Sequence, residues 1–129
     1  MPLKFINTIQ NNDSNATLVF EGEANPLAKN INDFFISRNY KLKSGTLSNA
    51  VYEKGNYVAR ILLGAFIKYY KFNVIIKAGE NNKLLVHFLK GHSGFSGGLI
   101  GIAKLKKEFK LILEALEKAD DALGIYAAS

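Results

Sequence analysis

Residues 102–123 read IAKLKKEFKLILEALEKADDAL and carry the clearest structural signal in the chain. Apolar residues recur at every third or fourth position, as Ile102, Leu105, Phe109, Ile112, Leu116, Ala119 and Leu123. This spacing places them in one stripe along a helix, which we expect to be buried against the rest of the domain. The same stripe also suits a seam between two helices of different chains, so a homo-oligomer is the alternative.

A glycine-rich loop, GHSGFSGG at residues 91–98, opens into this helix. Glycines leave backbone N–H groups accessible, and the start of a helix attracts anions. Lysines follow within the next two turns. The sequence therefore predicts an anion-binding site made of Gly94, Gly97, Gly98, Lys104, Lys106 and Lys107. The alternative is that these lysines are solvated or form pairs along the helix, as Lys110 would with Glu114.

The composition indicates one globular domain, residues 1–129, with 48% hydrophobic and 22% charged residues. The chain has no cysteine, which excludes disulfides and thiolate chemistry. No apolar run approaches the roughly 18–20 residues of a transmembrane segment. The segment 1–7 lacks the apolar core of a signal peptide, so we expect a cytoplasmic protein.

The net charge of +6 is concentrated in one segment, because residues 54–110 carry eleven Lys or Arg against two Glu. Such a segment would attract an anionic partner: nucleic acid, an anionic membrane surface or an acidic protein. The alternative is that its lysines are ordinary solvent-facing residues spread over several sides of the domain.

The first third of the chain predicts a hairpin and a helix. Residues 4–10 and 16–21 alternate like strands, and the polar cluster between them favours a turn. Asn25-Pro26 is typical of a helix start, with Asn25 as N-cap, and predicts a helix over 26–38. Asn39 can end it in a left-handed conformation.

The middle of the chain predicts short strands at 40–43 and 47–53, separated by a turn at Ser44-Gly45. Residues 57–71 suit a helix across about 58–66 that passes into a strand near Tyr69. The segments 72–78 and 83–90 then predict a hairpin.

The two faces of this hairpin differ in composition. One face would be buried and holds Phe72, Val74, Ile76, Leu84, Val86 and Phe88. The opposite face holds Ile75, Leu85 and Leu89, more aliphatic surface than solvent usually meets, so we expect it to contact another chain or the helix near 58–66.

These elements predict an α+β fold, a single domain with an antiparallel β-sheet and two main helices packed on one face. In architecture this order resembles helix-grip or TATA-binding-protein-like small domains. The helix-grip resemblance implies a pocket between sheet and helices that suits a small ligand.

Catalytic and metal-binding patterns are absent or incomplete. Gly94-Phe95-Ser96-Gly97-Gly98 matches G-x-S-x-G, but both histidines, His87 and His92, precede the serine, and the chain is about half the length of that hydrolase fold. No phosphate-loop motif occurs. Two histidines without nearby carboxylates do not make a metal site. We therefore expect a protein that is not an enzyme and uses no cofactor or metal.

Aromatic residues and lysines are interleaved over residues 66–72, with Lys68, Tyr69, Tyr70 and Lys71 at the centre of this patch. Such a patch suits single-stranded nucleic acid, whose bases stack on rings while lysines follow phosphates, or a membrane interface. The alternative is that the rings belong to the core.

The leading functional hypothesis is a non-catalytic binding module that uses the basic segment 54–110. The alternative is a small-ligand carrier with an apolar pocket between sheet and helices.

Overall fold

The computed structural model describes residues 3–11, 15–55, 69–90 and 98–118. The described elements are, in order, β1 (Lys4–Asn11), β2 (Asn15–Glu21), α1 (Ala24–Ser37), β3 (Lys41–Thr46), β4 (Asn49–Gly55), β5 (Tyr69–Ala78), β6 (Lys83–Lys90) and α3 (Gly98–Leu116). The helix predicted near 58–66 and the last two positions of the apolar stripe, Ala119 and Leu123, lie outside these residues.

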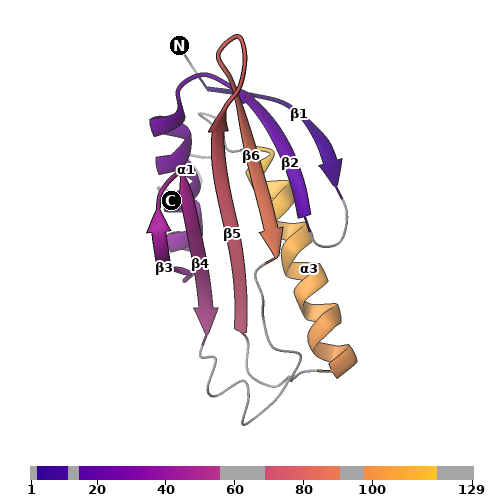
Figure 1. The fold of residues 1–129 in the computed structure, drawn as a ribbon. Helices are drawn as coiled ribbons and strands as arrows, with labels where there is room; N and C mark the ends of the chain where they lie inside the picture. Colours follow the sequence, from indigo (N-terminus) through magenta and orange to yellow (C-terminus); the bar gives the residue numbers. More distant parts are fainter. Residues whose placement is uncertain (1–2, 12–14, 56–68, 91–97, 119–129) are drawn as a thin grey trace.

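The six described strands form one antiparallel sheet in the order β1-β2-β6-β5-β4-β3, with β1 and β3 at its edges (Figure 1). Strands β3 to β6 follow one another as a meander, and β6 pairs with β2 of the N-terminal hairpin. Helix α1 therefore carries the chain from β2 to the opposite edge of the sheet.

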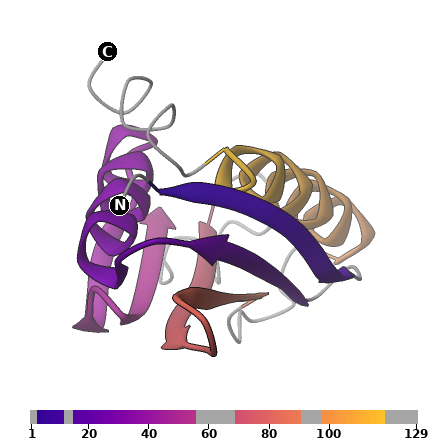
Figure 2. The same cartoon turned by 90° about the horizontal axis from the view of Figure 1, so that it is seen from above.

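Both helices lie on the same face of the sheet (Figure 2). Aromatic rings fill the layer between them and the strands. The ring of Phe88 on β6 stacks on Phe109 of α3 with centroids 4.6 Å apart, and Phe35 of α1 stacks on Tyr52 of β4 at 4.2 Å. The predicted α+β class, with two helices on one face of an antiparallel sheet, is confirmed. The closer resemblance to helix-grip or TATA-binding-protein-like domains stays a prediction.

The predicted β5–β6 hairpin is confirmed together with its buried face. Its buried side chains, from Phe72 to Phe88, all belong to the core cluster that packs on the helices. The other face, turned toward the viewer in Figure 1, holds Ile75, Leu85 and Leu89, which are half-buried. No described helix covers it.

The turn predicted at Ser44-Gly45 is wrong. Thr46 pairs with Asn49, so the chain reverses at Leu47 and Ser48, and Gly45 lies within β3. Gly45 has a φ of +87°, and a Cβ there would lie 2.0 Å from the carbonyl oxygen of Asn49. Glycine is required here by a close backbone approach inside a hairpin rather than by the turn itself.

The predicted start of the first helix is also wrong. Helix α1 begins at Ala24, two residues earlier, and its N-cap is Glu23, whose side chain makes no capping hydrogen bond. Pro26 is instead the third helical residue, where its missing N–H still costs nothing because that group has no partner inside the helix. The predicted left-handed ending is confirmed, since Asn39 has a φ of 71°.

Candidate functional site

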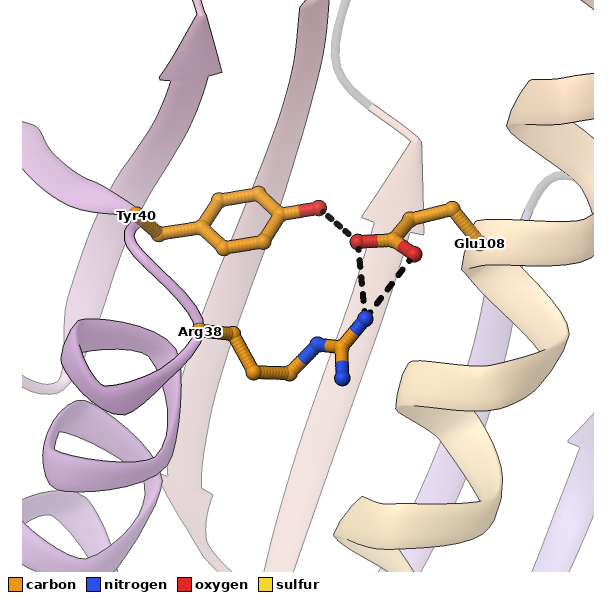
Figure 3. Close-up of polar contacts among 3 residues, drawn as sticks. All are labelled: Arg38, Tyr40 and Glu108. Carbon is orange, nitrogen blue, oxygen red and sulfur yellow. Dashed lines mark hydrogen bonds and ion pairs between the residues drawn. The ribbon is translucent and has the colours of Figure 1, made fainter. Parts of the chain in front are cut away.

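A buried carboxylate ties the two helices together. Glu108 lies on the side of α3 that faces the sheet and is only 8% exposed. Its Oε2 accepts a hydrogen bond of 2.6 Å from the Tyr40 hydroxyl, and the Arg38 Nη2 donates to Oε1 and Oε2 at 3.1 and 3.4 Å (Figure 3). We call Arg38, Tyr40 and Glu108 the Glu108 cluster.

The end of α1 positions two members of this cluster. Arg38 is the C-cap of the helix, and the left-handed Asn39 then reverses the chain so that the Tyr40 N–H bonds to the carbonyl of Phe35. Arg38 and Tyr40 therefore leave the same turn side by side and both point toward α3 (Figure 3). This short turn thus places two hydrogen-bond donors where both can bind the Glu108 carboxylate.

Burial keeps the Tyr40 hydroxyl protonated. Loss of water around Tyr40 raises the pKa of its hydroxyl far above its ordinary value, and the hydrogen bond to Glu108 and the charge of that carboxylate raise it further. Tyr40 therefore remains a donor at physiological pH and cannot serve as a base. Because Arg38 and Tyr40 both hold Glu108, the cluster anchors α3 and shows no arrangement for acid–base catalysis.

One polar atom in the cluster makes no hydrogen bond to any described residue. The Arg38 Nε is buried and, in the part of the chain that the structure describes, makes no hydrogen bond. Its guanidinium carbon lies 6.0 Å from the centre of the Phe34 ring, close enough for a weak cation–π contact. The Arg38 side chain as a whole is 29% exposed, so its charge keeps contact with water.

The outer side of α3 is basic between Lys106 and Lys110, before the exposed Glu114. Lys106, Lys107 and Lys110 are exposed, and they form what we call the α3 basic face. The pair proposed from the sequence between Lys110 and Glu114 is not formed, and Lys107 also has no ion pair among the described residues. The like charges of Lys106 and Lys110, four residues apart, repel one another.

The predicted anion-binding residues are only partly described. Helix α3 begins at Gly98, close to the predicted start, and Lys106 and Lys107 are exposed. Gly94, Gly97 and the side chain of Lys104 lie outside what the structure describes. Anion binding at these residues stays a prediction.

The predicted aromatic and basic patch is divided by the sheet. Tyr70 is 6% exposed and faces the helices, whereas Lys71, its neighbour on β5, lies on the opposite face. Lys68 and the side chain of Tyr69 are not described. Tyr70 and Lys71 therefore do not share a surface, and the ring of Tyr70 belongs to the core.

The lysines of the segment 54–110 do not form one continuous face. The strand register places Lys54 and Lys90 on the helix-facing side of the sheet. It places Lys71, Lys77 and Lys83 on the opposite side of the sheet. The exposed lysines of the α3 basic face form a third group. The positive segment is thus several surfaces, of which the α3 basic face is the one on the helix that follows the glycine-rich loop.

The raised pKa of Tyr52 predicts how the stability of the fold depends on pH. The Tyr52 hydroxyl donates to Asn32 Oδ1 at 3.1 Å, and burial, with a smaller contribution from the charge of Asp33, raises its pKa from 10.0 to about 12. The unfolded chain loses this proton first, so the stability that the raised pKa provides is present below pH 10 and is lost as pH rises toward 12. We expect this fall to reach the order of 2 kcal/mol.

Urea unfolding between about pH 9 and pH 12, on the wild type and Tyr52→Phe, checks this prediction. The difference between the two stabilities should shrink as pH rises, because phenylalanine has no proton to lose. A difference that stays constant across this range would show that the Tyr52 hydroxyl is accessible to water.

Sequence reasoning missed the Glu108 cluster. A signal for it exists, because Glu108 lies three residues after Leu105 and four before Ile112, inside the apolar stripe. A carboxylate in that position requires a buried partner.

No protein-family model matches the chain, and searches of curated proteins and of solved structures return no significant match. Within the described ranges, no group of three or more His, Cys, Asp or Glu side chains is placed to hold a metal ion. Neither described helix combines the length and the apolar character needed to cross a bilayer.

Proposed function

We propose that this protein is a non-catalytic binding module whose α3 basic face contacts an anionic partner. The supporting observation is the division of charge across α3. Between Lys104 and Lys110 the only acidic residue is Glu108, which is turned inward, forms an ion pair with Arg38 and accepts a hydrogen bond from Tyr40. Over this stretch the exposed charged side chains of the helix are therefore all basic, and Lys107 and Lys110 form no ion pair among the described residues.

The scaffold supports recognition because α3 is held firmly. Phe109 and Ile112 are buried in the core, and the Glu108 cluster adds a directional contact to the end of α1. Lysines on a fixed helix meet a partner with less conformational entropy to lose than lysines on a loop.

Helix geometry favours an extended partner. Lys106 lies eight residues after Gly98, which is about 12 Å along the helix axis. A single phosphate cannot contact both the N-terminal amides and Lys106, whereas a polyanion with repeated charges can. Single-stranded nucleic acid and an anionic bilayer both supply such repeated charges.

The carrier hypothesis receives no comparable support. Where a pocket between sheet and helices would lie, the stacked pairs Phe88–Phe109 and Phe35–Tyr52 occupy the layer. These rings are the packing of a core rather than the lining of a cavity.

The test is a charge reversal on α3. Titrations of a labelled single-stranded oligonucleotide and of phosphatidylserine-containing vesicles at low salt should show binding of at least one probe. The variant Lys106→Glu, Lys107→Glu, Lys110→Glu should weaken that binding about 100-fold or more, at ~1 kcal/mol for each lysine near an anionic surface.

A matched control reverses three exposed lysines elsewhere, Lys4, Lys29 and Lys77, and changes the net charge by the same amount. It should keep most of the affinity. Equal losses in both variants would mean that only net charge matters, and a folded wild type that binds neither probe would refute the proposal.

A further inference from the structure

The sheet has a second face that no described element covers. It is the face turned away from both helices, and we call it the open face (Figure 2). Its aliphatic residues, placed there by the strand register, are Val19, Val51, Ile75, Leu85 and Leu89. Except for Val19, at 9% exposed, they are half-buried and form an apolar centre across β2, β4, β5 and β6.

Lysines surround this centre. Six lysines lie on the open face: the register places Lys4, Lys41, Lys71, Lys77 and Lys83 there, and Lys43, the extra residue at the β3 irregularity, reaches it through its ion pair with Glu53. Among the described strand residues, the acidic residues on this face are Glu21 and Glu53. Ion pairs of 3.3 Å between Lys83 and Glu21 and of 3.0 Å between Lys43 and Glu53 engage both carboxylates. Six positive charges against two leave an excess of four.

We propose that the open face docks a protein partner that presents an aliphatic patch surrounded by Asp and Glu. Charge complementarity argues for this occupant, because an apolar centre within a basic rim matches an apolar centre within an acidic one. A second copy of this chain would bring the same excess of positive charge to the interface and would be repelled.

Two other modes of docking fit this surface less well. The described side chains of the open face include no Phe, Tyr or Trp ring on which a nucleic-acid base could stack, and the half-buried His87 ring is hydrogen-bonded to Thr17 at 3.1 Å. Strand addition at the sheet edges is hindered, because β1 has register shifts at two places and β3 has one as well as the left-handed Gly45. The partner therefore lies on the face instead of extending the sheet.

The experiment uses a display library of random 12-residue peptides as the probe. Selection on the wild type should enrich sequences that combine Asp or Glu with Leu, Ile or Val. An enriched peptide should shift the backbone amide resonances of Ile75, Leu85 and Leu89. Lys71→Glu combined with Lys77→Glu should weaken its binding at least about tenfold, and melts should show that this variant folds.

Three results would overturn the proposal: no enrichment, enriched peptides without acidic residues, or amide shifts that map to α3. Displacement of the peptide by the oligonucleotide, with shifts at the same amides, would assign the open face to nucleic acid instead. The inference is independent of the α3 basic face. The triple α3 reversal should leave peptide binding unchanged, so each proposal can fail without the other.

Discussion

Replacing Phe109 with alanine should lower the free energy of unfolding by about 3–5 kcal/mol. Phe109 is 3% exposed, and its ring stacks on Phe88 with an interplanar angle of 10° and lies 6.2 Å from the ring of Phe72. Truncation would remove these contacts and leave a cavity between α3 and the sheet. The loss would be a large share of the stability of a small domain.

Denaturant unfolding measures this loss, and Leu111→Ala is the matched control. Leu111 lies on the same helix but is 40% exposed, so its truncation should change stability by less than about 0.5 kcal/mol. A loss below about 1 kcal/mol for Phe109→Ala would mean that α3 does not pack on the sheet. Its apolar stripe would then be free to form a seam with a second chain, and sedimentation at two concentrations would detect that association.

Replacing Glu108 with alanine should cost about 3 kcal/mol. The substitution would leave the Tyr40 hydroxyl buried without an acceptor and the Arg38 charge without its carboxylate. The cost lies toward the lower end of the range for broken buried ion pairs, because the 29% exposure of Arg38 lets water recover part of it.

The variant Glu108→Gln separates hydrogen bonding from charge. Glutamine keeps an acceptor for Tyr40, so it should recover about half of the loss. Coupling between Glu108→Ala and Tyr40→Phe in a double-mutant cycle would confirm the contact, because each of these substitutions removes the hydrogen bond. Glu114→Ala, at an exposed position on the same helix, is the control. Additive effects of the two cluster substitutions would contradict the geometry of Figure 3.

The β5–β6 hairpin was predictable because local and long-range signals agree there. Alternating apolar residues flank a polar turn, and Asn81 and Asn82 adopt the positive φ angles, 56° and 62°, that such a turn requires. The apolar stripe of α3 was predictable for the same reason, since periodicity alone determines which side of a helix is buried.

The irregular strands were harder to predict. Simple alternation along β1 fails because register shifts between Phe5 and Asn7 and between Thr8 and Gln10 place Phe5 and Thr8 on the helix-facing side. Ile6 and Ile9 are the extra residues at these two shifts, and isoleucine gives no local signal of a β-bulge. The sheet face on which each β1 residue lies is therefore determined only by its pairing with β2.

The Glu108 cluster depends on contacts that sequence order conceals. Glu108 lies 70 residues from Arg38 and 68 from Tyr40, and Arg and Glu are residue types that usually face solvent. They meet only because α1 and α3 pack next to each other on the same face of the sheet. The same folding step turns Lys106, Lys107 and Lys110 outward, so the candidate binding surface follows from the tertiary structure rather than from the count of lysines.

The decisive measurement is the salt dependence of binding for the wild type and for a neutralised variant, Lys106→Gln, Lys107→Gln, Lys110→Gln. With the oligonucleotide as probe, each lysine–phosphate contact contributes about 0.7 to the slope of log K against log salt concentration. Three contacts on the α3 basic face therefore predict a slope that is shallower by about 2 in the variant, with weaker binding at low salt. Equal affinities and equal slopes for the two proteins would contradict the proposal that α3 binds an anionic partner.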